Sequence, residues 1–277
     1  MQPRSWLFVP ADSERKIAKA LESEADALIF DLEDSVAPSN KAKAREMLKA
    51  LPKGSSGPAF WVRVNPIGSG FHKDDLGVIR AAEIHGIVLP KSESGADVIQ
   101  LAHRTGNIPI HAIVTETAAS LFGLLSYRDP KSPLAAMSWG AEDLSAALGA
   151  SSKYEPDGEL SFTYRLARTL CLAGAVAAGV QPVDGVFADF RDEEGLRKET
   201  EAARREGFTG KLAIHPSQVG VINTAFTPSE QEVRHAEEIV AAFEARPDAG
   251  VLSVGGRMVD RPHLLQARRV LERATRE

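Results

Sequence analysis

The chain has 277 residues, of which 43% are hydrophobic, so it is long enough to bury one large core. Its net charge of −5, with acidic and basic residues interspersed, excludes the concentrated basic surface that nucleic-acid binding needs. The single cysteine, Cys171, excludes an internal disulfide framework. We expect Cys171 to lie in the core. We also expect a cytoplasmic protein without a membrane segment, because no secretory signal opens the chain and the apolar run 170–180 is too short to span a bilayer.

Eight short β-type runs alternate along the chain with segments that have apolar residues at helical spacing, such as 13–23 and 41–51. The runs are residues 5–9, 27–32, 59–65, 86–90, 109–114, 135–139, 183–188 and 211–216. Nearly continuous apolar strands separated by helices indicate a parallel sheet that is covered on both sides. Eight such units in about 225 residues fit a closed barrel better than an open doubly wound sheet. We therefore predict an α/β fold, a (β/α)8 TIM barrel, for residues 1–226.

Residues 227–277 extend beyond the eighth unit. Thr227 to Glu230, "TPSE", fits a capping box with proline at the first helical position, and it predicts a helix that ends near Ala245. A turn at Gly255-Gly256 and a second helix follow. Both helices carry apolar stripes that need a surface to cover them. We predict a C-terminal helical extension or lid that packs on a neighbouring subunit, and hence a homo-oligomer.

Polar residues end nearly every predicted strand. They are Asp31, Glu33 and Asp34, then Arg63 and Asn65, Lys91, Glu116, Glu142 and Asp143, Asp189 and His215. In a (β/α)8 barrel the active site lies at the carboxyl ends of the strands, so these residues are candidates for chemistry. Carboxylates that converge there raise one another's pKa values unless a cation neutralises them. Oxygen ligands without a Cys/His cluster favour Mg²⁺ as that cation.

Each of these residues also has a simpler interpretation. Any one acid can be a helix N-cap or a solvated loop carboxylate, so the joint placement carries the prediction. Arg63 lies in the apolar run 59–65 and needs an anion, either a neighbouring carboxylate such as Glu33 or a substrate carboxylate bound through two hydrogen bonds. The histidines at 72, 85, 103 and 111 lack ligand spacing, and we expect surface or satisfied structural roles for them.

Nine fragments in order resemble the HpcH/HpaI aldolase and citrate lyase β-subunit family over the whole chain. They are RSWLFVPA, DLEDSV, WVRVN, LPKSES, VTETAAS, SWGAEDL, ADFRDEEGL, GFTGKLAIHPSQ and GRMVDRPHL. The resemblance is closest to CitE-like proteins and to citramalyl-CoA and malyl-CoA lyases. The chain departs from the family's V-P-G at Val9-Pro10-Ala11, near the loop that handles the thioester.

The resemblance implies roles for individual residues. Glu116 and Asp143 hold Mg²⁺, and Arg63 holds the carboxylate of the keto acid. Glu33 and Asp34 fix metal-bound waters and Arg63 in place. Lys91, Gly140, Ala141 and Glu142 contact the substrate. Asp260 exchanges a proton with the α-carbon of the acyl-CoA, and it does so in the active site of an adjacent protomer. The protein is then a trimer or hexamer.

The reaction so implied is Mg²⁺-dependent cleavage, or formation, of a 3-hydroxyacyl-CoA thioester such as citramalyl-CoA or malyl-CoA. The partners are then a CoA thioester and a small α-keto acid, and the products are acetyl-CoA and that keto acid. Three alternatives stay open: the β subunit of a citrate lyase complex acting on citryl-acyl-carrier-protein, a malyl-CoA thioesterase, and a non-catalytic module that binds CoA or a keto acid.

Overall fold

The computed structural model describes residues 2–52, 57–129 and 131–274, and the described chain divides into two compact units. The first unit comprises residues 2–223 and the second begins at Thr224. The division therefore falls inside helix α9 (Ser217–Phe226), close to the boundary that the sequence suggested after residue 226.

The first unit is a closed barrel of eight parallel strands in the order β1 to β8. The strands are β1 (Ser5–Pro10), β2 (Ala27–Asp31), β3 (Ala59–Arg63), β4 (Gly86–Ser92), β5 (Ile110–Val114), β6 (Leu134–Trp139), β7 (Gln181–Asp184) and β8 (Gly210–Ala213). The ring closes where β1 pairs with β8. The predicted (β/α)8 barrel is thereby confirmed.

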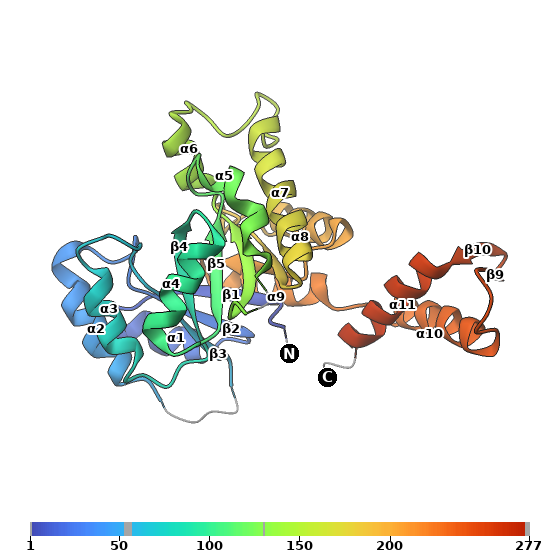
Figure 1. The fold of residues 1–277 in the computed structure, drawn as a ribbon, viewed down its shortest axis with the longest axis horizontal. Coiled ribbons are helices and arrows are strands. Elements are labelled where there is room, and N and C mark those ends of the chain that lie inside the picture. The colour runs from blue at the N-terminus through green and yellow to red at the C-terminus, as the bar shows by residue number, and fades with distance from the viewer. Residues whose placement is uncertain (1, 53–56, 130, 275–277) are drawn as a thin grey trace. The chain divides into compact units, whose positions relative to one another are not determined.

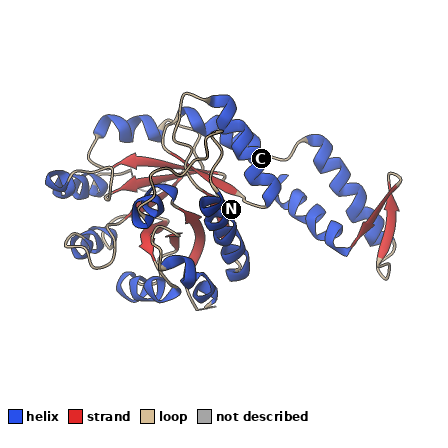
Figure 2. Ribbon diagram, turned by 90° about the horizontal axis from the view of Figure 1, so that it is seen from above, coloured by secondary structure: helices blue, strands red, loops and turns tan. Residues whose placement is uncertain are grey.

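Helices follow the strands and surround the barrel (Figures 1 and 2). They are α1 (Glu14–Leu21), α2 (Lys41–Lys49), α3 (His72–Ile79), α4 (Gly95–Thr105), α5 (Ser120–Gly123), α6 (Ala141–Leu148), α7 (Phe162–Ala178), α8 (Glu193–Glu206) and α9, with 3-10 turns at Pro38–Asn40 and Leu124–Arg128. Helix α1 is typical, since Ile17 and Ala20 are buried between charged residues. Cys171 of α7 is buried, as expected.

Large apolar side chains form one cluster that draws on all eight strands, among them Trp6, Ile29, Trp61 and Leu212. Because side chains alternate between the two faces of a strand, residues two positions further along share the same face. Asp31 follows Ile29, and Arg63 follows Trp61, at the carboxyl ends of β2 and β3. Alternation thus places these two charged residues directly above the apolar barrel interior.

His111 of β5 is buried among aromatic rings rather than placed at the surface. Its ring lies edge-on to Trp6, with 4.7 Å between ring centroids, and edge-on to Trp61. Neither ring nitrogen has a hydrogen-bond partner among the described residues, and burial lowers the pKa of His111 to about 3. The expectation of a surface or satisfied histidine is wrong here, because the strand period points the ring into an apolar interior.

The seventh strand lies earlier than predicted. It spans Gln181–Asp184, whereas the sequence suggested 183–188. Gly185 ends it against Trp139, whose indole Nε1 would lie 2.9 Å from a Cβ at this position. Asp184, not Asp189, is therefore the last residue of β7.

Asp184 is fully buried and joins three elements around the barrel. It accepts hydrogen bonds from Trp139 Nε1 at 2.8 Å, Arg168 Nε at 2.8 Å and Lys211 Nζ at 2.9 Å. Burial alone would raise the pKa of Asp184, but the charges of Lys211 and Arg168 outweigh it and hold the pKa well below its usual range. The contacts tie β6, β7, β8 and α7 together.

The second unit contains α10 (Glu230–Ala245), the antiparallel hairpin of β9 (Val251–Val254) and β10 (Arg257–Asp260), and α11 (Arg261–Ala274). Gly255 and Gly256 form the predicted turn with φ of 57° and 76°, which glycine adopts without strain. The predicted capping box lies two residues later than expected. Ser229 caps α10, and its backbone amide donates to the side chain of Glu232. The Thr227 amide instead donates to Thr224 O at the end of α9.

The apolar stripes of α10 and α11 are covered largely within this unit. Ile239, Phe243, Leu252 and Val259 belong to a cluster that both helices and the hairpin share. These faces therefore leave less apolar surface for a neighbouring subunit to cover than the sequence suggested. The side chains that stay exposed in the single chain include Val251, Met258 and Leu265.

No helix in the described part of the chain is both long and apolar enough to cross a membrane.

Candidate active site

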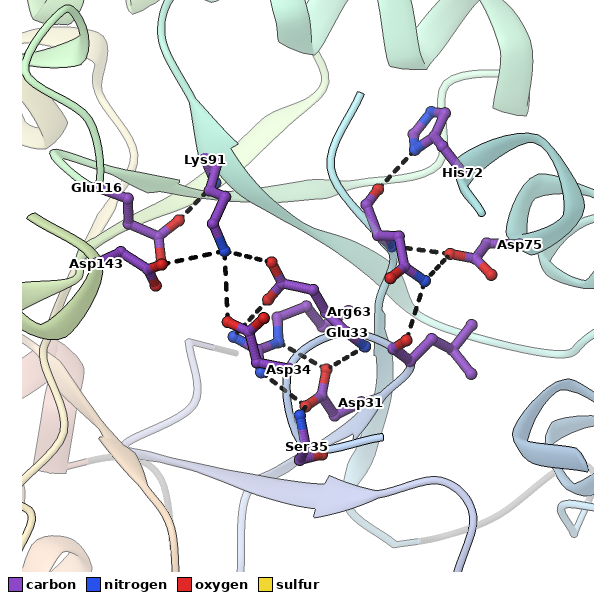
Figure 3. A network of polar contacts seen from close by, with 12 residues as sticks. Asp31, Glu33, Asp34, Ser35, Arg63, His72, Asp75, Lys91, Glu116 and Asp143 are labelled. Atoms are coloured by element: carbon purple, nitrogen blue, oxygen red, sulfur yellow. Dashed lines mark hydrogen bonds and ion pairs between the residues drawn. The ribbon is translucent and has the colours of Figure 1, made fainter. Parts of the chain in front are cut away.

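Acidic and basic side chains from five neighbouring strand ends, those of β2 to β6, meet at the carboxyl end of the barrel (Figure 3). The members of this group are Asp31 at the end of β2, Glu33 and Asp34 after it, Arg63 at the end of β3, Lys91 in β4, Glu116 after β5 and Asp143 in the first turn of α6. Most of the predicted site residues are thus brought together.

Arg63 is held by Asp31. In the register of β2 and β3 the two residues lie side by side. Asp31 Oδ1 accepts from Arg63 Nε at 2.7 Å and Oδ2 accepts from Nη2 at 2.6 Å. Burial would raise the pKa of Asp31, but the charge of Arg63 keeps it below its usual value. Asp31 therefore fixes one edge of the guanidinium and leaves Nη1 pointing toward Glu33, with 3.0 Å to Glu33 Oε2.

Glu33 links the two basic side chains of the site. Its Oε1 accepts from Lys91 Nζ at 2.5 Å, while its Oε2 faces Arg63. The side chain is only 3% exposed, and burial raises the pKa of Glu33 above its usual value in spite of the two cations. Asp34 is more exposed and lies 3.4 Å from Lys91 Nζ.

Lys91 is the centre of the group. The pairing of β4 with β5 shifts register between Leu89 and Ser92, and Lys91 there has a φ of 50°. Such bulges redirect side chains near active sites. The Lys91 amide donates to Glu116 Oε2 at 2.5 Å, and its ammonium reaches Glu33 and, at 3.2 Å, Asp143 Oδ1. One lysine therefore contacts carboxylates from three different strand ends.

Glu116 is almost fully buried behind Lys91. Burial, with Asp143 and Glu33 nearby, raises the pKa of Glu116 to about 8. Thr115, which precedes it, has a φ of 71°, a conformation that is rare for a β-branched residue and is found mainly where surrounding structure enforces it. The backbone is thus held in an unfavourable conformation where it presents Glu116.

Gly140, predicted as a substrate contact, is adjacent to Glu116. A Cβ at this position would lie 2.6 Å from Glu116 Cγ and 2.9 Å from Oε1. Glycine is therefore what leaves room for the carboxylate. Ala141 begins α6, and Glu142 is exposed and paired with Lys153 rather than with the central group.

The donor set fits Mg²⁺. No cluster of three or more Asp, Glu, His or Cys side chains suited to a metal occurs among the described residues. Mg²⁺, however, needs only one or two protein carboxylates and takes its other ligands from water and substrate. Glu116 and Asp143 provide two such carboxylates, and Glu116 is buried near Asp143 and Glu33, where a bound cation would favour its charged form.

Three predicted or candidate residues lie outside the group. Asp189 and His215 follow β7 and β8, where His215 stacks on Phe190 with 4.8 Å between centroids. Asp260 belongs to the second unit, at the end of β10. Its Oδ1 lies 2.5 Å from His263 Nδ1, and hydrogen bonding from His263 lowers the pKa of Asp260. Asp260 also lies where an N-cap of α11 would lie, since its Oδ1 accepts from the His263 amide at 3.4 Å.

Sequence reasoning missed two residues that shape the site. Asp31 was noted only as one of three acids. Its role as the partner of Arg63 follows from its position, because Asp31 is the fifth residue of β2 and Arg63 is the fifth residue of β3. Lys41 gave no signal, because a lysine that opens an amphipathic helix is usually solvated. Here it is buried beneath the β2 loop.

Comparisons with known proteins place the chain in a family. The model of the family HpcH/HpaI aldolase/citrate lyase matches residues 4–216, and that of a C–C bond lyase of the TIM-barrel fold matches residues 162–276. A (3S)-malyl-CoA thioesterase from Cereibacter sphaeroides is 38% identical over 275 residues, which cover 98% of this chain and 94% of the relative. The mitochondrial citramalyl-CoA lyase of Rattus norvegicus is 33% identical over 298 residues, with 98% and 86% covered.

A crystal structure is similar over nearly the whole length. It is that of the protein CitE from Mycobacterium tuberculosis in complex with magnesium, acetoacetate and coenzyme A. Its TM-score is 0.85 at 36% sequence identity, and 98% of each chain is covered.

Proposed function

Because the chain belongs to the HpcH/HpaI aldolase/citrate lyase family, we propose that it is a Mg²⁺-dependent carbon–carbon lyase of 3-hydroxyacyl-CoA thioesters. Citramalyl-CoA or malyl-CoA would be cleaved to acetyl-CoA and an α-keto acid, or formed from them. The observation that carries the proposal is the buried carboxylate of Glu116, which accepts from the Lys91 amide, beside the Asp31-bound guanidinium of Arg63.

Glu116 and Asp143 are the proposed ligands of Mg²⁺. The similar CitE structure contains magnesium, and the two carboxylates described here have the chemistry that this ion prefers. When bound, Mg²⁺ would supply Lewis-acid stabilisation of negative charge on the substrate oxygens. Gly140 supports the arrangement by leaving room for Glu116.

Arg63 is proposed to bind the carboxylate of the keto acid. Since Asp31 occupies the Nε–Nη2 edge, the remaining donors of the guanidinium face the centre of the group. Glu33 and Asp34 would then keep Arg63 and the metal-bound waters in place, and Lys91 would contact the substrate. A guanidinium oriented before substrate arrives loses less conformational entropy on binding.

Cleavage breaks the bond between the α and β carbons of the thioester. The β-hydroxyl gives its proton to a carboxylate of the site, the β carbon becomes the carbonyl of the keto acid, and the electron pair of the broken bond passes to the thioester as an enolate. A proton delivered to the α carbon then completes acetyl-CoA. Positioned donors that stabilise the developing charge supply most of the rate.

We assign that last proton to Asp260 of an adjacent protomer in a homo-oligomer, a trimer or hexamer. Two observations support the assignment. Asp260 ends an exposed hairpin, and Val251 and Met258 of the same hairpin leave apolar surface uncovered in the single chain.

A panel of malyl-, citramalyl- and methylmalyl-CoA thioesters tests the proposal. We expect cleavage of at least one, loss of the activity with EDTA and its recovery with added Mg²⁺. Turnover that persists in EDTA would contradict the metal requirement. Binding of CoA or keto acid without any turnover would indicate a non-catalytic module instead.

A thioesterase is the second candidate, because one relative at 38% identity is a (3S)-malyl-CoA thioesterase. It would release malate and free CoA. The β subunit of a citrate lyase complex is the third, and it would purify with partner subunits and act on an acyl-carrier-protein thioester.

A further inference from the structure

Lys41, the first residue of α2, is 6% exposed beneath the loop that follows β2. Its Nζ donates to Leu32 O at 2.6 Å, Glu33 O at 2.8 Å and Asn65 Oδ1 at 2.9 Å. An ammonium group has three N–H donors, so each is matched by one acceptor. The three acceptors are neutral, and two of them are backbone carbonyls of the acidic loop.

Asn65 extends this contact to the end of β3. Its Nδ2 donates to Leu32 O at 2.9 Å, and both Nδ2 and its backbone amide donate to Asp75 Oδ2, at 2.7 and 2.8 Å. Asp75 is fully buried and also accepts from Arg45 Nε at 2.8 Å. Lys41 is therefore anchored to a hydrogen-bond network that joins the loops after β2 and β3 with α2 and α3.

Burying an ammonium group costs desolvation free energy, and three neutral acceptors return less of it than a carboxylate would. An apolar side chain could fill the same space, but it would leave Asn65 Oδ1 without this donor and could not hold the two carbonyls of the loop. The location of the acceptors offers a reason, because Glu33 is the residue that faces both Arg63 and Lys91.

We propose that Lys41 is a positioning residue of the active site. By holding the carbonyls of Leu32 and Glu33 it fixes the backbone from which the Glu33 side chain extends. Glu33 in turn sets the positions of the Lys91 ammonium and the Arg63 guanidinium. The inference rests on the proposed function for its catalytic consequence, but its structural consequence can be measured separately.

The test compares Lys41→Met, which affects the loop after β2, with a matched control near the amino end of β2. Arg4 and Asp26 form an ion pair of 2.9 Å just before β1 and β2, at the amino end of the barrel. Arg4→Met also removes a charged contact, the one to Asp26 just before β2, and should lower Tm. Asp26, however, lies at the opposite end of β2 from Glu33. Both variants are assayed with the thioester that the wild type cleaves, at a temperature where circular dichroism shows them folded.

We expect Lys41→Met to lower kcat by about 10- to 100-fold, with KM changed by less than about threefold, as for displaced catalytic groups. Arg4→Met should keep kcat within about twofold of the wild type under the same principle. Equal loss of kcat in both variants, or wild-type kcat in Lys41→Met, would overturn the inference.

A second variant keeps the test decisive if Lys41→Met does not fold. Lys41→Gln retains polar atoms but lacks the reach and the third donor, and its crystal structure reports the site directly. We expect the contact of 2.5 Å between Glu33 Oε1 and Lys91 Nζ to be lost. An unchanged Glu33 would overturn the inference. If the wild type cleaves no thioester at all, the proposed function fails while this structural outcome still decides the role of Lys41.

Discussion

Gly140→Ala should weaken Mg²⁺ binding without unfolding the barrel. The Gly140 backbone, with φ −124° and ψ 103°, accepts any residue, so the new methyl group introduces no backbone strain. Its Cβ would lie 2.6 Å from Glu116 Cγ, whereas carbon atoms in contact prefer about 3.5–4.0 Å. Glu116 must therefore shift by about 1 Å, and its short bond to the Lys91 amide must lengthen.

Overpacking of this kind costs about 1–3 kcal/mol, which corresponds to about a 5- to 150-fold loss of affinity when binding requires the displaced geometry. Titration calorimetry with Mg²⁺ measures the loss, and thermal unfolding measures stability. Gly77→Ala in α3 is the control, because a Cβ there meets nothing within 4 Å. Equal Mg²⁺ affinity of Gly140→Ala and the wild type would refute the assignment of Glu116 as a ligand that Gly140 accommodates.

The other predictions concern individual side chains. Alanine at Glu116 or Asp143 removes an anionic ligand and should sharply weaken Mg²⁺ binding in calorimetry; unchanged affinity in both variants would refute the metal site. Arg63→Lys cannot bind Asp31 and a substrate carboxylate together, so pyruvate, glyoxylate or oxaloacetate should bind more weakly by about 1–3 kcal/mol, and wild-type affinities for all three would count against it. His111 has a folded-state pKa of about 3, below its unfolded value, so stability is lost as pH falls below about 6.5. Between pH 7 and pH 5, urea unfolding should show about 2 kcal/mol more loss for the wild type than for His111→Phe, and parallel losses would exclude this role. Mixed Asp260→Asn and Glu116→Ala chains should form hybrids that regain activity, whereas hybrids as inactive as their parents would exclude an Asp260 that acts in trans.

Much of the site could be predicted from the sequence because strand ends are recognisable. A barrel brings all carboxyl ends of its strands to one rim, so Glu33, Arg63, Lys91 and Glu116 could be grouped without knowing a single distance. The partner of Arg63 follows from strand register, which pairs it with Asp31. Register between two neighbouring parallel strands is the information that the sequence analysis did not use.

The seventh strand shows where the pattern misleads. In the sequence, Pro182 argues against an interior strand at its position, and the apolar run after Gly185 favours a strand there instead. In the structure Pro182 pairs with Met137 inside the barrel, and Gly185 ends the strand at the Trp139 ring. A close contact between segments far apart in the sequence decided the boundary, and composition does not contain that information.

Lys41 and Lys91 illustrate what local patterns cannot give. Lysine is usually solvated, and only the fold reveals that Lys41 meets three acceptors from two strand ends. The bulge that turns Lys91 toward Glu116 likewise depends on pairing between β4 and β5. The proposed role of Asp260 involves a second protomer, and the hybrid experiment described above tests it.

The fate of the carbon–carbon bond tests the central claim most directly. The enzyme is incubated with Mg²⁺ and the thioester that it cleaves, labelled with ¹³C at the β carbon, and the products are followed by NMR. For a lyase, the label should appear in the carbonyl carbon of an α-keto acid, together with unlabelled acetyl-CoA. Label retained in a free hydroxy acid, with release of CoA, would contradict a lyase and establish a thioesterase.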